Sequence, residues 1–188
     1  MFSRIIPSLD IIENFKQPLT EGEKALLIYL DKHLQIDNNF DEASGLDNYN
    51  GWLIFVQPFL NGCRPDIIVF HPRVGVQIFE VKDWNLNNYS FIENDMGKNV
   101  FVVSDRNGSY PIKTPIQQVV YYKEKLTGQL VPQIGEQIDS DFKKYGLIKT
   151  AIYFHNSTTS QAQDLFKTQI KDYKKFPVCG NDNLLRNN

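Results

Sequence analysis

Cysteine is scarce in this sequence, and the cysteines present lack the spacing of a metal site. Cys63 and Cys179 are the only two among 188 residues, and they form no C-x-x-C motif. A structural zinc site needs several Cys or His ligands at short, regular spacing. The sequence therefore predicts two free thiols, no structural zinc and a reducing, cytoplasmic location.

Long apolar runs are missing as well. No stretch of about 18 consecutive apolar residues occurs, which argues against a transmembrane helix and against a membrane partner. The N-terminal segment contains Pro7, Asp10 and Glu13, so it does not have the pattern of a signal peptide. Because 41% of the 188 residues are hydrophobic, we expect residues 1–188 to form a single folded domain.

The chain also lacks an excess of positive charge. It has 20 Lys and Arg against 22 Asp and Glu, a formal net charge of −2. Proteins that bind nucleic acid usually gain much of their affinity by neutralising phosphates, so such binding here would need a local basic patch or another polypeptide. His33, His71 and His155 show no triad or metal-ligand spacing, and no glycine-rich phosphate loop indicates an ATPase.

One segment places charged residues within two apolar, β-rich runs. Residues 66–71 and 76–83 flank a turn that contains Pro and Gly, a pattern that predicts a β-hairpin. Asp66 and Glu80 are about equally far from the turn, so we expect their carboxylates to meet across the two strands. Lys82 shares a strand face with Glu80, because side chains two residues apart point the same way.

Charged side chains in such apolar strands are costly unless they are paired or bind a metal ion. Mg²⁺ prefers oxygen ligands, commonly one or two carboxylates completed by water and substrate phosphate. Two interpretations of the hairpin follow. Asp66 and Glu80 form a metal site, or Lys82 forms a salt bridge with one of them at the edge of a sheet.

A helix predicted near residues 21–34 carries an acidic residue close to its start. Leucines recur along this segment at helical spacing and form an apolar stripe. Thr20 and Glu23 have the spacing of a capping box, in which the Glu23 carboxylate accepts from the Thr20 amide. Glu23 also shares the face of the leucines, so its carboxylate would point inward toward a metal on the hairpin. One residue can fill both roles.

The rest of the chain alternates between β-rich and helical patterns. We expect strands near residues 52–56, 147–154 and 176–179, a second hairpin over 89–104, helices near 114–126 and 160–173, and a polar tail over 181–188.

The helix predicted near 114–126 has a polar face. Thr114 suits its N-cap and Pro115 its first turn. Gln118, Tyr122 and Lys125 follow one another at helical spacing on one side. This side either lines a groove or is simply solvated, and the helix alone does not decide between these interpretations.

Taken together, these motifs resemble the nuclease-related domain (NERD) branch of the PD-(D/E)XK nuclease superfamily. The family pattern is matched in order by Gly22-Glu23, by Asp66 before an apolar strand, by Glu80-Val81-Lys82 with an aromatic residue after it, and by Pro115-Ile116-Gln117-Gln118. The resemblance covers about residues 20–180. It implies an α/β fold with a restriction-endonuclease-like core: a mixed central β-sheet flanked by helices.

The resemblance also implies a function, a metal-dependent nuclease that acts on DNA within a DNA-processing or defence protein. It implies catalytic roles for Asp66, Glu80, Lys82 and Gln118, with Mg²⁺ or Mn²⁺ held by Asp66, Glu80 and Glu23. A helicase or another domain, joined C-terminally or acting in trans, would then account for the missing basic charge.

We further expect Tyr122, Lys125 and Trp84 to contact the nucleic acid. Three alternatives stay open at this point. The chain is a catalytically silent module that binds nucleic acid or a partner protein, a ribonuclease with the same core, or a purely structural domain.

Overall fold

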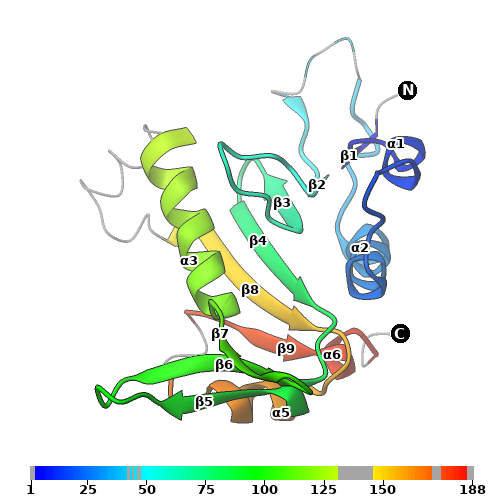
Figure 1. Ribbon diagram of the computed structural model, residues 1–188. Coiled ribbons are helices and arrows are strands. Elements are labelled where there is room, and N and C mark those ends of the chain that lie inside the picture. The colour runs from blue at the N-terminus through cyan, green and yellow to red at the C-terminus, as the bar shows by residue number, and fades with distance from the viewer. Residues whose placement is uncertain are drawn as a thin grey trace.

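The computed structural model describes residues 3–41, 43, 45, 48–130, 146–170 and 175–185. A six-stranded sheet runs through its centre, in the strand order β1-β2-β3-β4-β8-β9 (Figure 1). Its strands are β1 (Ile5–Ile6), β2 (Leu53–Val56), β3 (Ile67–His71), β4 (Gly75–Lys82), β8 (Ile148–Phe154) and β9 (Val178–Gly180).

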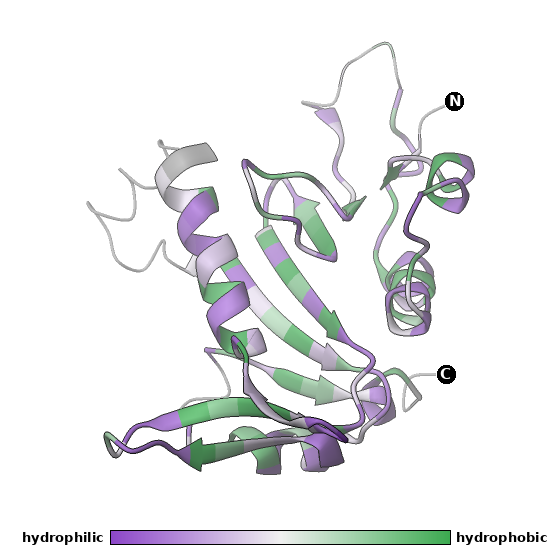
Figure 2. Ribbon diagram, in the orientation of Figure 1, coloured by the Kyte–Doolittle hydropathy of each residue, from purple (hydrophilic) through white to green (hydrophobic). Residues whose placement is uncertain are grey.

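The predicted hairpin forms the middle of this sheet. β3 and β4 are antiparallel, with His71 paired to Gly75 at the turn. Parallel pairs join β4 to β8 and β8 to β9, and another joins β1 to β2. The sheet is therefore mixed, which confirms the predicted class of fold. Apolar residues run along the central strands β3, β4 and β8, with polar residues between them on β4 (Figure 2).

Helices cover both faces of the sheet, as the strand pattern requires. They are α1 (Leu9–Glu13), α2 (Glu21–His33), α3 (Pro115–Lys125), α5 (Thr159–Phe166) and α6 (Asn181–Leu185), with a 3-10 turn η3 (Leu86–Asn88) and a π-helical turn η4 (Leu126–Leu130). No helix among the residues described is long and apolar enough to cross a membrane.

Alternation along β3 divides the core between the two faces. Ile67 and Val69 pack with the leucines of α2 in one buried cluster. Ile68 packs on the other face, in a cluster that includes Tyr122 of α3. Because neighbouring strand residues point to opposite faces, α2 and α3 are held on opposite sides of the sheet (Figure 1). The hairpin between them is thus fixed from both sides.

A second, three-stranded sheet packs beside the first. It consists of β5 (Tyr89–Glu93), β6 (Asn99–Asp105) and β7 (Gly108–Pro111). The sequence predicts the β5–β6 hairpin but not β7, which follows a turn into Gly108. Phe101 of β6 is buried in a cluster with Val119 of α3 and with Phe154 of β8. This sheet therefore extends the core on the α3 side.

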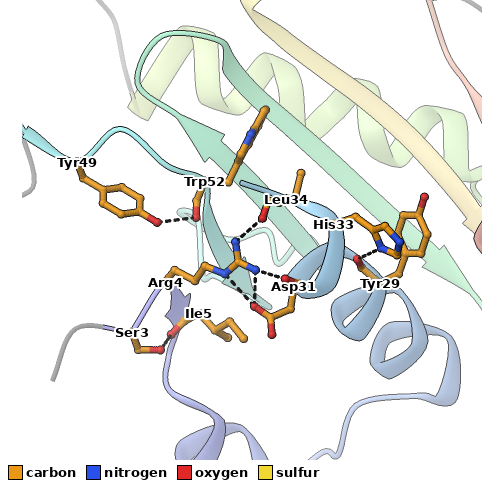
Figure 3. Close-up of polar contacts among 9 residues, drawn as sticks. All are labelled: Ser3, Arg4, Ile5, Tyr29, Asp31, His33, Leu34, Tyr49 and Trp52. Carbon is orange, nitrogen blue, oxygen red and sulfur yellow. Dashed lines mark hydrogen bonds and ion pairs between the residues drawn. The ribbon is translucent and has the colours of Figure 1, made fainter. Parts of the chain in front are cut away.

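The N-terminal strand β1 is held by a buried arginine (Figure 3). Arg4 forms an ion pair with Asp31 near the end of α2, with 2.8 Å between Arg4 Nε and Asp31 Oδ1. Its Nη1 also donates to the Leu34 carbonyl, at 2.9 Å. These bonds tie the C-terminal end of α2 to the sheet edge. A strand of two residues carries too little pattern to be predicted from sequence.

The C-terminal part differs from the prediction in two places. Residues 181–185 form α6 rather than a polar tail, because Asp182 Oδ1 accepts hydrogen bonds from the Thr159 amide and hydroxyl, both at 2.7 Å. The helix predicted to reach residue 173 is assigned only as far as Phe166, while residues 171–173 and 186–188 lie outside the described part. Cys63 and Cys179 are free thiols, as predicted.

Candidate metal-dependent nuclease site

Two carboxylates meet at the open end of the hairpin. The last strand pair is Ile67 with Phe79, so Asp66 lies opposite Glu80 one step further from the turn. The Val81 amide donates to Asp66 Oδ2 over 2.6 Å, which fixes the orientation of that carboxylate. Glu80 is buried, with only 2% of its surface exposed. The predicted convergence of the two side chains is therefore present.

The electrostatics of this pair are unfavourable in the absence of a cation. Burial raises the pKa of Asp66, and the charge on Glu80 raises it further, to about 8. Burial likewise raises the pKa of Glu80, although Lys82 opposes the shift. Glu23 adds to the increase in both pKa values. A cation between these carboxylates would remove the repulsion that raises their pKa values.

Lys82 compensates this negative charge only in part. Its ammonium group forms an ion pair with Glu80 Oε1. Glu80 Oε2 is buried and has no hydrogen-bond partner at normal geometry among the residues described. The Tyr122 hydroxyl faces the same carboxylate and lowers the pKa of Glu80 through a hydrogen bond whose geometry lies outside the normal range. The salt bridge that the sequence offered as an alternative is thus real, but it leaves one carboxylate oxygen unsatisfied.

Glu23 caps α2 and also points at the hairpin. The Thr20 amide donates to Glu23 Oε2 at 2.7 Å, and the Glu23 amide donates to Thr20 Oγ1 at 3.2 Å, which completes the capping box. The other carboxylate oxygen accepts from Gln57 Nε2, at 2.8 Å. The residue is only 4% exposed. The capping role is confirmed, and its effect on the pKa of Asp66 places it close to the carboxylate pair.

Gly22 explains how the start of α2 reaches the end of β4. Its amide donates to Asp83 Oδ2 over 3.0 Å. A Cβ at this position would lie 2.1 Å from Asp83 Oδ1 and 2.9 Å from a Val81 methyl carbon. Only glycine permits this approach, and the approach brings Glu23 to the site. The Gly-Glu pair therefore combines a packing requirement at Gly22 with a carboxylate placed beside Asp66.

Sequence reasoning missed two residues that organise the rim of the site. Gln57 has a positive φ of 46° and bonds to Glu23. Arg64 donates to the Gln57 carbonyl and side-chain oxygens, and its guanidinium lies 5.8 Å from the centre of the Phe15 ring. No motif marks Gln57. Arg64 could have been found from the sequence, because it is a basic residue only two positions before Asp66.

These residues line two neighbouring cavities. The first cavity, about 360 Å³, is lined by Glu23, Asp66, Lys82 and Trp84 among others. The second cavity, about 650 Å³, is lined by residues that include Gln118 and Tyr122. Arg64 lines both. Of the predicted site residues, Glu80 and Lys125 line neither cavity, and the others are divided between the two.

Trp84 and Lys125, two of the residues predicted to contact nucleic acid, each lie against an aromatic ring of the protein. Trp84 stacks on Tyr89 at 4.1 Å between ring centres while still lining the first cavity. Lys125 lies beside the Tyr121 ring, with Nζ 5.4 Å from its centre. Trp84 therefore has a packing role in addition to any contact with a ligand.

The carboxylates of the site fit a divalent cation only with help from other ligands. Within the described ranges, no three His, Cys, Asp or Glu side chains form a cluster that could hold a metal by themselves. Mg²⁺ is nevertheless commonly bound through one or two carboxylates, with water and substrate phosphate completing the shell. The unsatisfied Glu80 Oε2 and the raised pKa of Asp66 are consistent with such a site.

A mixed α/β sheet with this carboxylate pair and lysine on its central hairpin has the form of a restriction-endonuclease-like core. The sequence model of the nuclease-related domain family (NERD) matches residues 20–155. The chain therefore belongs to the nuclease-related domain family. Comparison with curated proteins and with solved structures gives no match.

Proposed function

We propose that this protein is a metal-dependent phosphodiesterase that cleaves DNA. The observation that carries the proposal is the pairing of the partly buried Asp66 with the buried Glu80, whose Oε2 is unsatisfied and whose other oxygen binds Lys82. Membership of a nuclease-related family supports the same reaction class. A cytoplasmic module of a DNA-processing or defence protein, working with a helicase or another domain, fits this activity.

Asp66 and Glu80 would hold Mg²⁺ or Mn²⁺, with Glu23 as a third carboxylate. When bound, such a cation polarises a phosphate oxygen and makes water a better nucleophile near neutral pH. The Val81 amide keeps Asp66 aimed at this position through its 2.6 Å bond. Gln57 in turn holds Glu23 at 2.8 Å.

Lys82 and Gln118 would act on the phosphate itself. The Lys82 ammonium is held at the carboxylate pair by Glu80 and lies 5.3 Å from the Trp84 ring centre. From there it would stabilise negative charge that develops on the phosphate oxygens in the transition state. Gln118 lines the adjoining second cavity, where its amide would donate to a backbone phosphate or orient water.

The test is Mg²⁺-dependent cleavage of labelled DNA by Glu80→Gln and Lys82→Met proteins. Each change removes a group from the reacting centre and nearly preserves side-chain size, so we expect the cleavage rate to fall at least about 100-fold. Glu93→Gln, at an exposed position on β5, is the matched control. Cleavage that continues unchanged in the Glu80→Gln protein would contradict the proposal.

A second candidate function is a catalytically silent module that binds DNA or a partner protein through the same cavities. The observation in its favour is that no three potential metal ligands cluster among the described residues. Such a protein would bind DNA without metal-dependent products, and its Asp66→Ala variant would bind as well as the wild type. A parallel binding and cleavage assay separates the two candidates.

A further inference from the structure

The second cavity adjoins the carboxylate site but lies beyond the reacting centre. It is formed between the loop that joins β2 to β3 and one face of α3. Figure 1 shows this loop extending from the sheet toward α3. Because Arg64 lines both cavities, they meet at this residue. A flexible polymer that passes the carboxylates can therefore continue past Arg64 into the second cavity.

Arg64 is held at this junction with part of its donor set unused. Its Nε and Nη2 atoms donate to the carbonyl and side-chain oxygens of Gln57, and the ring of Phe15 supports the guanidinium. It forms no ion pair with any carboxylate of the described residues. A guanidinium carries five donors in a planar fork that matches phosphate. The remaining donors are suited to a phosphate between the two cavities.

Tyr121 provides a second kind of contact in the same cavity. It is 44% exposed although it is a large aromatic residue, and it lines the cavity together with Lys113. The Lys125 ammonium lies 5.4 Å from the centre of its ring. Exposed aromatic rings beside basic side chains are the usual surface for stacking unpaired bases. The face of Tyr121 thus adds an aromatic platform to the phosphate site at Arg64.

We propose that the second cavity binds single-stranded DNA that continues from the cleaved phosphate, with Arg64 on its backbone and Tyr121 against a base. The inference rests on the proposed function and names its substrate class. In a duplex each base is already stacked between its neighbours, so only an unpaired base can offer its face to Tyr121. Lys113, also lining the cavity, adds positive charge for the following phosphate.

The test measures binding rather than cleavage. Fluorescence anisotropy of a short labelled oligonucleotide, in EDTA, gives Kd for a single strand and for the blunt duplex of the same sequence. We expect Tyr121→Ala to raise Kd for the single strand about 5- to 100-fold and to leave duplex binding nearly unchanged. Tyr121→Phe, which keeps the aromatic face, should bind like the wild type. Tyr110→Ala, at an exposed tyrosine on β7, is the control.

Arg64 is tested by the salt dependence of the same binding. Arg64→Ala should weaken single-strand binding and lower the slope of log K against log salt by about 1, since one phosphate contact is lost. Arg64→Lys should restore the slope but not the full affinity, because the planar fork is missing. Arg73→Ala, at an exposed position in the hairpin turn, should change neither quantity.

The inference is overturned if Tyr121→Ala weakens single-strand and duplex binding equally, or if the two variants behave like their controls. An RNA strand that binds more tightly, with the same dependence on Arg64 and Tyr121, would support the second cavity as a single-strand site and overturn DNA as the substrate. Because the assay contains no metal, a chain that fails to cleave DNA still shows whether this cavity binds a single strand. Cleavage with normal binding by Tyr121→Ala would overturn only this inference.

Discussion

Two ion pairs in this molecule, each with one buried partner, differ in how completely their charges are satisfied. Arg4 is 7% exposed and binds both the Asp31 carboxylate and the Leu34 carbonyl, while the Asp31 side chain is 47% exposed and remains in contact with water. Lys82 and Glu80 are 14% and 3% exposed, and Glu80 keeps one oxygen without a partner. The first pair joins two elements of the fold.

The second pair retains negative charge that the fold does not balance. Asp66 adds a second carboxylate to Glu80, and Lys82 opposes the charge of both. Burying like charges together lowers stability unless something else compensates. The Arg4 pair is therefore assigned to folding, and under the proposed function the Glu80 pair would serve binding. Changes at the two pairs should therefore affect stability with opposite signs.

The largest effect is expected from Arg4→Ala. It removes the ion pair with Asp31 and the hydrogen bond to Leu34, and it leaves a cavity between β1 and α2. Breaking a buried pair costs about 3–5 kcal/mol when the remaining charge is buried; because Asp31 stays partly solvated, we expect about 2–4 kcal/mol. Urea denaturation followed by circular dichroism measures the loss. A change below about 1 kcal/mol would show that β1 is not anchored by this residue.

Removing a charge from the carboxylate pair should raise the stability of the fold, whereas Arg4→Ala lowers it. The effect should appear as a dependence of stability on pH. Asp66 has a pKa of about 8 in the folded, metal-free chain and about 4 when unfolded, so the folded state holds more protons between these values. Its contribution to stability is fully present below pH 4 and is lost as the pH rises through 8. We expect metal-free wild type to lose about 1–3 kcal/mol across this window.

Asp66→Asn provides the comparison for this pH dependence. Asparagine can still accept from the Val81 amide but does not ionise, so the variant should lose less stability as the pH rises and exceed the wild type at pH 8. Thermal melts in EDTA from pH 5 to 9 measure both proteins. Parallel curves would show that Asp66 is not the group that titrates in this window.

Sequence reasoning succeeded where the pattern is local and periodic. The hairpin of β3 and β4, the capping box of α2 and the start of α3 at Pro115 each follow from neighbouring residues. The convergence of Asp66 and Glu80 also followed, because equal distance from a turn fixes the register of a hairpin. The geometry of each of these features is determined by residues that are close together in the sequence.

The remainder of the site depends on contacts between distant segments. The bond between Gln57 and Glu23 joins residues 34 positions apart, and Gln57 reaches it with a left-handed backbone that no sequence pattern marks. A side chain at Gly22 would collide with Asp83, which lies 61 positions away in the sequence, so the need for glycine is visible only in the fold. The sequence predicted that Gln118 and Asp66 belong to one site. It did not predict that they line two separate cavities that meet at Arg64.

Metal binding itself should change the stability of the fold by a smaller amount. Titration calorimetry with Mn²⁺ and Mg²⁺ should show binding to the wild type and none to Glu80→Ala. At a free metal concentration of about ten times Kd, the stability gain is about 1.4 kcal/mol. At pH 7 binding should also release protons, since a cation displaces the proton that the raised pKa of Asp66 retains. Buffers with different ionisation enthalpies measure that release.

The control for this experiment is Asp31→Asn, which removes a carboxylate from the structural ion pair and should leave metal binding unchanged. Absence of binding to the wild type at millimolar metal, repeated with a short oligonucleotide present, would contradict the metal site. Binding that persists in Glu80→Ala would place the cation elsewhere in the chain.

The smallest effect on stability is expected at an ion pair with both partners exposed, which gives a baseline for the two pairs that have a buried partner. Lys24 Nζ lies 3.0 Å from Glu21 Oε1, at side-chain exposures of 50% and 77%. Water screens such a pair, so Lys24→Gln should change the free energy of unfolding by less than about 0.5 kcal/mol in urea. A larger loss would mean that distance alone sets the strength of ion pairs in this protein. The different effects expected at the Arg4 and Glu80 ion pairs would then need an explanation other than their burial and the number of their hydrogen-bond partners.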